Sequence, residues 1–433
     1  MTDKYHFACV DCHAEYAGDQ VIYLCPVCGA ANQPGFPPRG VLKTLYPYQK
    51  MRDMHPVSGL FDRLQGERFL PLLPLHAMDS WPRLEVGNTP LYRLDGRAPE
   101  APVVSGNLQV ENSKAGFKLF LKDDSQNPTF SFKDRASALV SAWARENNIH
   151  TLITASTGNA GSSLAGICAS QGQESVIVVP AAAPLAKLTQ ILMYGAILVP
   201  VKGTYDDAFD TSVEITARHG WYNRNTAYNP LTIEGKKTVA FELYQQLGYQ
   251  VPDRIFIPVG DGVIYSAVCK GFEDLLMLGI IDRMPVAVAV QSEGSSNLID
   301  NLGRPFVPVA SKTVADSISV DVPRCFHMTA GYISKYDGET IAVSDGEILA
   351  ASLQVARSAG IFCEPAAAAA YAGMEKYRRL GLIPAGSSNV VLLTGSGLKD
   401  LEAVQSSISI PEPVGTDRRA VDDFLNKQKI SRS

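Results

Sequence analysis

NPTFSFKDR, residues 127–135, joins a short apolar run at 117–122 to a long helix-compatible stretch at 131–147. Asn-Pro is typical of a turn, and Ser131 is a candidate N-cap, which would put Lys133 in the first helical turn. The helix dipole and the two flanking phenylalanines would both disfavour the ammonium form of Lys133. A free amine is a better nucleophile, although a solvated lysine at a helix start has the same local pattern.

Outward from this junction, short apolar runs alternate with longer helical segments. The expected strands are 117–122, 151–155, 175–180, 196–201, 254–259, 285–291 and 389–394. The expected helices are 131–147, 158–171, 184–194, 206–219, 233–247, 263–279, 346–359 and 365–380. This alternation predicts a parallel sheet with helices on both faces. Ligands in such sheets bind beyond the carboxyl ends of the strands, so the strand-to-helix loops are the candidate sites.

Composition indicates a globular protein. The 433 residues are 46% hydrophobic and 19% charged, which suits two or three domains with a large core. The net charge of -5 offers no basic surface for nucleic acid or an anionic membrane. No uncharged apolar run reaches the roughly 18–20 residues of a membrane span, and the first residues lack a signal-peptide core. We therefore expect a cytoplasmic protein with reduced cysteines.

Three further loops follow expected strands. ASTGNAG at 155–161 opens a helix, and its small residues and helix N-terminus suit an anion. VGDGVI at 259–264 would suit a phosphate, although Asp261 would repel one unless its side chain turns away, perhaps to cap the helix. LTGSGLKD at 393–400 ends the last clear strand. Each motif alone could equally be a tight turn that serves packing.

Together these motifs carry a family resemblance. NPTFSFKDR resembles the cofactor-lysine motif of the threonine synthase branch of fold-type II pyridoxal phosphate (PLP) enzymes, whose fold is similar to that of the tryptophan synthase β chain. The similarity runs from Gly87 to about Asp400 through the three loops in order. It implies an α/β protein with two parallel-sheet domains. We expect a zinc-ribbon-like segment at 1–35, a lead-in at 36–116 that includes part of the large PLP domain, a smaller α/β subdomain at 117–230, the large PLP-binding domain at 231–412 and a polar tail at 413–433.

The resemblance also implies how PLP is held. Lys133 would bind PLP as a Schiff base and act in catalysis, Asn159 would hydrogen-bond the 3′-hydroxyl, and Thr394 would face the pyridine nitrogen. A neutral hydroxyl there suits elimination and replacement better than transamination. Backbone amides would cradle the PLP phosphate, namely those of Gly260, Asp261, Gly262, Val263 and Ile264.

For the substrate, the resemblance places the carboxylate at Ser156 and Thr157. Lys187, Lys236 and Arg135 are candidates to hold a substrate phosphate, because lysine and arginine are the usual phosphate binders.

The implied reaction converts O-phosphohomoserine and water to threonine and phosphate, the work of a carbon–oxygen lyase in threonine biosynthesis. Replacement at Cβ of O-phosphoserine, as in cysteate synthase, remains open, as do threonine or serine dehydration and non-catalytic binding. Relatives are commonly dimers, so a homodimer is expected.

Four cysteines near the N-terminus form two pairs. Cys9-x-x-Cys12 and Cys25-x-x-Cys28 are separated by twelve residues, a spacing typical of a tetrahedral zinc site. A unit of some 30 residues cannot make an adequate core alone, so a metal would supply folding energy. Four thiolates leave no open position, which makes the predicted site structural. A disulfide pair or incidental cysteines fit a reduced compartment poorly.

Overall fold

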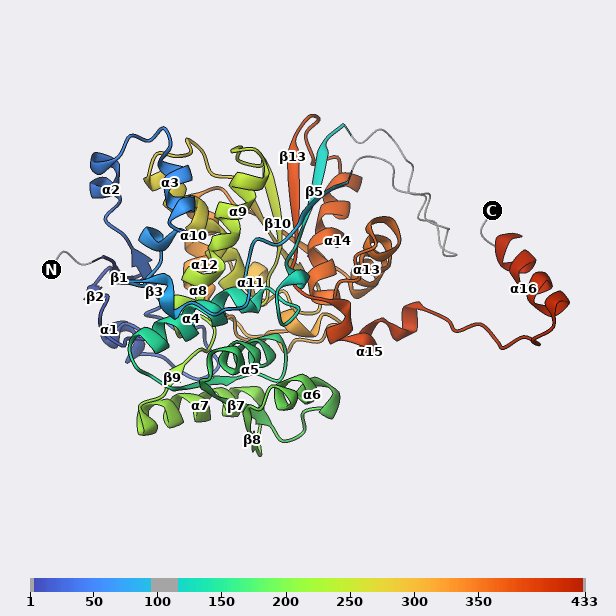
Figure 1. Ribbon diagram of the computed structural model, residues 1–433, viewed down its shortest axis with the longest axis horizontal. Helices are drawn as coiled ribbons and strands as arrows, with labels where there is room; N and C mark the ends of the chain where they lie inside the picture. Colours follow the sequence, from blue (N-terminus) through green and yellow to red (C-terminus); the bar gives the residue numbers. More distant parts are fainter. Residues whose placement is uncertain (1–3, 95–115, 431–433) are drawn as a thin grey trace.

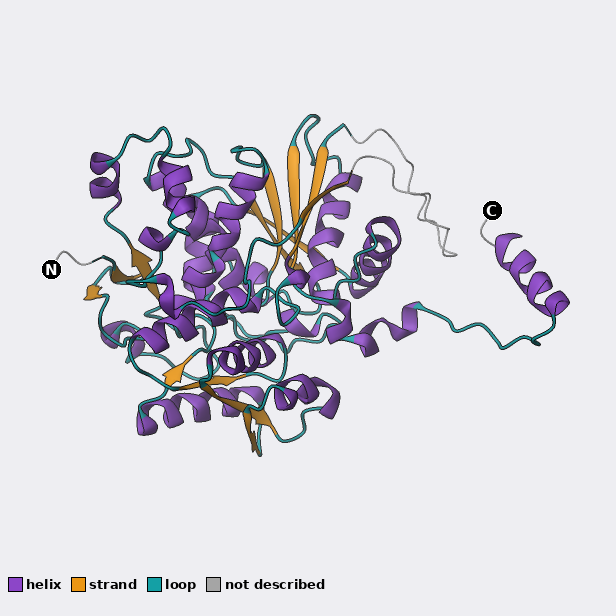
Figure 2. Ribbon diagram, viewed as in Figure 1, coloured by secondary structure: helices purple, strands orange, loops and turns teal. Residues whose placement is uncertain are grey.

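The computed structural model describes residues 4–94 and 116–430 (Figure 1). It confirms the α/β class, because two largely parallel sheets lie in two lobes, each packed with helices (Figure 2). The large sheet has the order β12-β11-β10-β13-β5-β4, and the small sheet has the order β8-β7-β6-β9. A third sheet, β2-β1-β3, lies near the N-terminus. Among the described residues, no helix combines the length and apolar character needed to cross a bilayer.

All seven predicted strands form, within two residues of the expected ends. The strands of the large sheet are β4 (Leu91–Leu94), β5 (Lys118–Asp123), β10 (Arg254–Pro258), β11 (Val286–Ser292), β12 (Glu339–Val343) and β13 (Ser388–Leu393). Only β4 runs antiparallel to its neighbour in that sheet. The strands of the small sheet are β6 (Thr151–Ala155), β7 (Glu174–Pro180), β8 (Ile197–Val201) and β9 (Tyr222–Asn223), all parallel. The N-terminal strands are β1 (His6–Cys9), β2 (Glu15–Ala17) and β3 (Leu42–Leu45).

The predicted helices also form, with one division. They are α4 (Lys133–Glu146), α5 (Asn159–Gln171), α6 (Leu185–Met193), α7 (Tyr205–His219), α8 (Leu231–Lys236), α9 (Thr238–Gln246), α10 (Val263–Met277), α13 (Asp345–Ala359) and α14 (Pro365–Arg379). The expected helix at 233–247 is two helices, α8 and α9, which meet at Lys237. Shorter or unforeseen helices include α1 (Pro26–Gly29), α2 (Tyr48–Met54), α3 (Leu60–Gly66), α11 (Asn297–Asp300), α12 (Phe326–Lys335), α15 (Leu401–Val404) and α16 (Arg418–Ile430). Figure 1 shows α16 lying apart from the body at the end of an extended segment.

The large sheet buries both faces, as its continuous apolar strands predict. Along β10, Ile255 and Ile257 face the core formed with α8, α9 and α10, while Phe256 faces the core formed with α13 and α14. β13 alternates in the same way. Because side chains alternate across a strand, one apolar run supplies two cores.

Two expected domain limits differ from the structure. The strand at 117–122 pairs with β13 in the large sheet, so the smaller lobe begins after it rather than at 117. The limit at 35 lies inside the N-terminal sheet, because β3 pairs with β1 in the register Cys9↔Leu42. In both cases the deciding partner is distant in the sequence, and local periodicity carries no trace of it.

Helices α4 and α8 touch through a glycine. A Cβ at Gly235 in α8 would lie 2.2 Å from the backbone oxygen of Arg135 in α4. Real Cβ atoms do not approach backbone so closely, so the contact requires glycine. This contact holds α4, which begins with Lys133, against α8, which ends with Lys236.

Replacing Gly235 by alanine should therefore destabilise the protein. The methyl group must displace backbone, and overpacking of this kind costs about 1–3 kcal/mol. Gly331→Ala is the matched control, since Gly331 lies in α12 with nothing within 4 Å of its added Cβ. That control should be neutral or slightly stabilising. Urea unfolding midpoints of the two variants test the difference, and equal midpoints would contradict the contact.

Candidate active site

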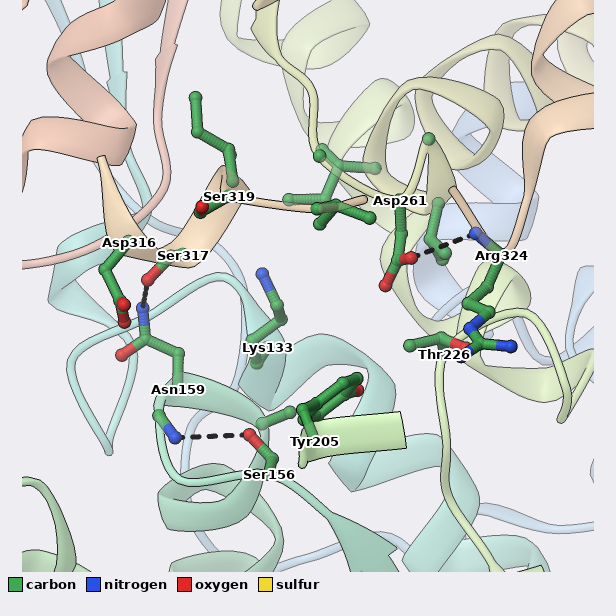
Figure 3. Close-up of a pocket in the computed structure, with 18 of the residues that line it drawn as sticks. Lys133, Ser156, Asn159, Tyr205, Thr226, Asp261, Asp316, Ser317, Ser319 and Arg324 are labelled. Atoms are coloured by element: carbon green, nitrogen blue, oxygen red, sulfur yellow. Dashed lines mark hydrogen bonds between the residues drawn. The ribbon is translucent and has the colours of Figure 1, made fainter. Parts of the chain in front are cut away.

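A cavity of about 530 Å³ lies between the two lobes, beyond the carboxyl ends of β6 and β10 (Figure 3). This is the position expected for a ligand in parallel α/β sheets. Its lining comprises Lys133, residues 156–160, residues 204–206, Arg224, Thr226, Lys236, Pro258, residues 260–264, residues 316–322 and Arg324. The loops ASTGNAG and VGDGVI are thus brought together, as the sequence predicted.

Lys133 is the first residue of α4 and points into the cavity (Figure 3). The N-cap position is held by Phe132 rather than the expected Ser131, whose Oγ accepts a hydrogen bond of 3.4 Å from the Lys133 amide. The Phe132 amide instead donates to the Thr394 backbone oxygen at 2.8 Å. Only one of the flanking phenylalanines desolvates the lysine, because Phe132 is buried and Phe130 is 49% exposed.

Burial lowers the pKa of the Lys133 ammonium. The carboxylates of Glu364 and Asp261 partly oppose this, and the positive charge of Arg224 adds to it. Within the described residues, Lys133 Nζ makes no hydrogen bond or ion pair. The cavity therefore contains an amine with depressed basicity that is available to react with a carbonyl.

Asn159 begins α5 at the edge of the cavity. Its Nδ2 donates to both carboxylate oxygens of Glu364, at 3.0 and 2.9 Å, and makes a longer contact of 3.4 Å with Ser317 Oγ. Ser156 Oγ accepts from the Gly158 amide at 3.2 Å. Ser156, Thr157 and Asn159 all line the cavity, and Asn159 lies beside Ser317 and Asp316 (Figure 3).

Sequence analysis did not identify Glu364. It precedes the alanine-rich helix α14, and it is buried with its pKa raised by desolvation. Its only local signal is the Glu-Pro pair at a helix start, which is equally typical of capping. The structure gives it a different task, because both its oxygens fix the amide of Asn159.

The loop at 260–264 forms a cradle at the N-terminus of α10. Gly262 has a φ of +88°, and a Cβ there would lie 2.2 Å from Thr329 Oγ1. A Cβ at Gly260 would lie 2.9 Å from the Cα of Ile318. Within the described residues, the amides of residues 260–262 donate to no acceptor. Unpaired amides at a helix N-terminus in a space closed to side chains fit a phosphate.

Asp261 turns its carboxylate away from these amides, but it does not cap α10. Its Oδ1 accepts from the Arg324 amide at 3.0 Å, and its backbone oxygen accepts from the Cys325 amide at 2.9 Å. Both donors lie at the start of α12, so Asp261 caps that helix instead. Burial raises the pKa of Asp261, which reduces its repulsion of an anion nearby.

Two buried cations face the cavity without a carboxylate partner. Lys236 is 2% exposed and has no hydrogen-bond or ion-pair partner among the described residues. Burial, with repulsion from Arg224 and Lys133, lowers its pKa well below the ordinary value. Arg224 donates only to neutral acceptors, Ser137 Oγ at 3.1 Å and the Lys133 backbone oxygen at 3.3 Å, and burial lowers its pKa to about 10. Desolvated cations of this kind favour an anionic ligand.

Two of the three predicted phosphate ligands lie elsewhere. Arg135 is buried in ion pairs with Asp124 at 2.6 Å and Glu242 at 2.5 Å, outside the cavity lining. Lys187 is not part of the lining, and its ammonium pairs at 2.7 Å with Asp316 at the edge of the cavity. Charge type alone cannot distinguish a paired cation from an unpaired one, which is why Arg224 was missed.

Thr394 directly follows β13 and is buried, but it does not line the cavity. Its role at a pyridine nitrogen stays a prediction.

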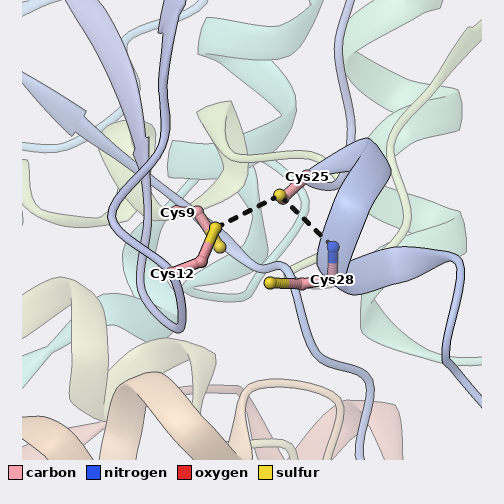
Figure 4. Close-up of side chains that lie close together, drawn as sticks. All are labelled: Cys9, Cys12, Cys25 and Cys28. Atoms are coloured by element: carbon pink, nitrogen blue, oxygen red, sulfur yellow. Dashed lines mark hydrogen bonds between the residues drawn. The ribbon is translucent and has the colours of Figure 1, made fainter.

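The four N-terminal cysteines converge (Figure 4). Their sulfur atoms all lie within 4.8 Å of one another, and Cys12 Sγ is 3.7 Å from Cys25 Sγ. Zinc–sulfur bonds of about 2.3 Å in a tetrahedron would put the sulfurs about 3.8 Å apart. The cluster therefore fits one tetrahedral metal ion.

Comparisons with known proteins give a consistent result. The family described as "Pyridoxal-phosphate dependent enzyme" matches residues 83–395. The threonine synthase of Methanocaldococcus jannaschii is 33% identical over 426 residues, which cover 97% of this chain and 99% of that one. The threonine synthase of Mycobacterium tuberculosis is 34% identical over 346 residues, covering 79% of this chain and 93% of its own.

Solved structures agree in fold. Threonine deaminase isoform 2 from Solanum lycopersicum is similar with a TM-score of 0.57 at 22% identity, covering 73% of this chain and 80% of that one. Maize serine racemase has a TM-score of 0.56 at 21% identity, covering 73% and 89%. Identities this low support the fold alone.

The depressed pKa of Lys236 predicts a pH-dependent stability. Between its lowered folded value and its ordinary value of 10.5, the unfolded chain binds one more proton than the folded chain. Stability must then rise with pH across that window. In cofactor-free, phosphate-free protein, Lys236→Met should be more stable than wild type below the window, with an advantage that shrinks as pH rises. Urea midpoints against pH test this, with exposed Lys118→Met as control, and a constant difference would contradict it.

Proposed function

The chain belongs to the threonine synthases within the pyridoxal-phosphate dependent enzymes, and we propose that it converts O-phosphohomoserine and water to threonine and inorganic phosphate. One observation carries the choice of a phosphorylated substrate. Lys236 and Arg224 are buried beside Lys133 in the cavity, and neither has a carboxylate partner among the described residues. A phosphate group supplies the missing negative charge.

The cradle and the lysine fit PLP. Lys133 Nζ would hold its aldehyde carbon, the amides at 260–264 its phosphate, Asn159 its 3′-hydroxyl and Thr394 its ring nitrogen. Support comes from the depressed pKa of the Lys133 amine and from the unpaired amides around Gly262. When bound, PLP supplies an electron sink for the pair left at the substrate Cα.

Lys133 is the proposed proton carrier. Its amine, when free, would take the proton from Cα and carry protons at Cβ and Cγ. The depressed pKa suits this work, because the neutral amine is populated closer to neutral pH. Ser156 and Thr157 orient the substrate carboxylate from the start of α5, where the helix dipole favours an anion.

Lys236 and Arg224 act on the leaving group. Phosphate departs from Cγ, a proton lost from Cβ is replaced by one gained at Cγ to give the methyl group, and water adds its hydroxyl at Cβ and its remaining proton to the phosphate, which balances the conversion to threonine and inorganic phosphate. Cations that stabilise the growing charge on the phosphate oxygens favour its departure. Lys236 and Arg224 replace Lys187 and Arg135 in this proposal, since the latter two are paired with carboxylates and do not line the cavity.

The purified protein should release phosphate and form threonine from O-phosphohomoserine. Lys133→Ala should abolish both products and the visible absorbance band of bound PLP, while Lys118→Ala, at an exposed strand start, should change neither. Borohydride reduction followed by peptide mapping should mark Lys133 in the wild type. A label on another lysine, or activity of Lys133→Ala near that of wild type, would reject the proposed role.

Two companion assays separate the alternative reactions. O-phosphoserine with sulfite tests replacement at Cβ, and threonine alone tests dehydration to a ketoacid. Turnover of either substrate in preference to O-phosphohomoserine would replace the proposed reaction while leaving the cofactor assignment intact.

We further infer that the cysteine cluster binds zinc in a structural role. The support is the convergence of four sulfurs with the spacing of a tetrahedral site. Cys9 and Cys25 are buried, and the cluster ties β1 to the turn before α1. A metal here would stabilise a three-stranded sheet that is too small to have its own core.

Metal analysis should find one zinc per chain in the wild type. Cys12→Ser should lose that zinc and lower the melting temperature, because three thiolates bind the ion more weakly. His13→Asn is the control, since asparagine tolerates the positive φ of 62° at this position and His13 is not one of the four converging residues. Full zinc content in Cys12→Ser would rule out that ligand.

A further inference from the structure

A second group of charges lies buried on the opposite side of α8. Glu234, Lys237, Lys270 and Asp274 are each at most 1% exposed, and their formal charges cancel. Lys237 Nζ contacts Glu234 and lies 2.6 Å from Asp274 Oδ2. Lys270 contacts Asp274 and lies 3.9 Å from Glu234 Oε1. In contrast to Lys236, every cation here has an anion.

Two tyrosines from the N-terminal region complete this cluster. Tyr46 Oη donates to Glu234 Oε2 at 2.5 Å, and Tyr48 Oη donates to Asp274 Oδ1 at 2.6 Å. The Tyr46 ring also faces Lys237, whose Nζ lies 4.2 Å from the ring centroid. Tyr46 directly follows β3, which pairs with the strand carrying Cys9, and Tyr48 begins α2.

Lys236, the last residue of α8, and Lys237, which directly follows it, thus lie in different electrostatic environments. Lys236 lines the cavity, and Lys237 joins the neutral cluster. A helix turns about 100° per residue, so the rotation of α8 about its axis decides where Lys236 points. Glu234 and Lys237, three residues apart, share one face of the helix.

Helix α8 cannot fix that rotation by itself. It has only six residues, and a helix this short is not stable alone, although the Asn229 side chain accepts a hydrogen bond of 2.9 Å from its first amide. Lys236 is also repelled by Arg224 and Lys133. Two contacts oppose this repulsion, namely the close approach of Gly235 to α4 and the hydrogen bond from Tyr46 to Glu234.

We propose that Tyr46 is a positioning residue for the substrate phosphate. Its hydroxyl fixes Glu234, and Glu234 fixes the rotation of α8 that aims Lys236 into the cavity. This inference rests on the proposed function, in which Lys236 binds the phosphate of O-phosphohomoserine. It gives the N-terminal sheet a part in substrate recognition, although no residue before Lys133 lines the cavity within the described chain.

The test is Tyr46→Phe, which removes one hydroxyl and keeps the ring. KM for O-phosphohomoserine and the inhibition constant of inorganic phosphate should both rise about three- to tenfold, the equivalent of one lost hydrogen bond. The kcat and the visible absorbance of bound PLP should change little, because Lys133 stays in place.

Tyr332→Phe is the matched control. Tyr332 is also buried and donates to a carboxylate of α10, Glu273 at 3.1 Å, but this bond does not reach α8. It should lower stability by a similar amount and leave both constants unchanged. Equal rises in the two tyrosine variants would mean that the effect is general destabilisation, which overturns the proposal.

A double-mutant cycle with Lys236→Met tests the route. Lys236→Met alone should raise both constants, and adding Tyr46→Phe should raise them no further. Additive effects, or unchanged constants in Tyr46→Phe, would overturn the proposal. Glu234→Gln weakens the same link from the helix side and should raise the same two constants, so a poorly folded Tyr46→Phe leaves the test intact.

The two levels of proposal fail differently. A wild-type protein with no turnover of O-phosphohomoserine would reject the proposed function. An active wild type whose constants are insensitive to Tyr46→Phe would reject the positioning role alone.

Discussion

The site depends on like charges that are held together in a desolvated space. Lys133, Lys236 and Arg224 line one cavity, and burial lowers the pKa of each. An isolated buried cation is costly unless it is neutralised or paired. The two lobes must therefore supply enough packing free energy to hold these three residues in place until an anion binds. The packing free energy thus offsets the cost of burying these residues, and an anionic substrate that pairs with them recovers part of that cost.

The same cost explains why the surrounding charges are so completely paired. Arg135 lies only two residues from Lys133, yet its guanidinium is occupied by Asp124 and Glu242. Lys237 directly follows Lys236 and is held between two carboxylates. Pairing of these two neighbours leaves the carboxylate-free cations Lys236 and Arg224 in the cavity, where a ligand can reach them. An unpaired buried cation outside the cavity would lower the free energy of unfolding without strengthening ligand binding.

The sequence predicted most of the regular structure and part of the site. Apolar runs and helix periods located all seven expected strands, and the loop motifs located Lys133, Asn159 and the cradle at 260–264, because these signals are local. The partner of β5 and the roles of Arg224 and Glu364 were not predictable, since each depends on residues far away in the chain. For the same reason, the sequence pointed to Arg135 as a candidate phosphate ligand, whereas the cavity contains Arg224. Composition gives the sign of a charge, and only the fold decides whether that charge is paired.

The split of the expected helix at 233–247 is a further case in which tertiary contacts override a local pattern. Adjacent residues of any α-helix point about 100° apart, so Lys236 and Lys237 would face different surroundings even in one continuous helix. Lys237 keeps helical dihedral angles between α8 and α9, and α8 is held against α4 where Gly235 allows the close contact. The paired charges of Glu234, Lys237, Lys270 and Asp274 then help to set the rotation of α8 about its axis. Lys236 in the cavity and Lys237 in the paired cluster are adjacent in the sequence, and the turn of the helix between them gives them different surroundings.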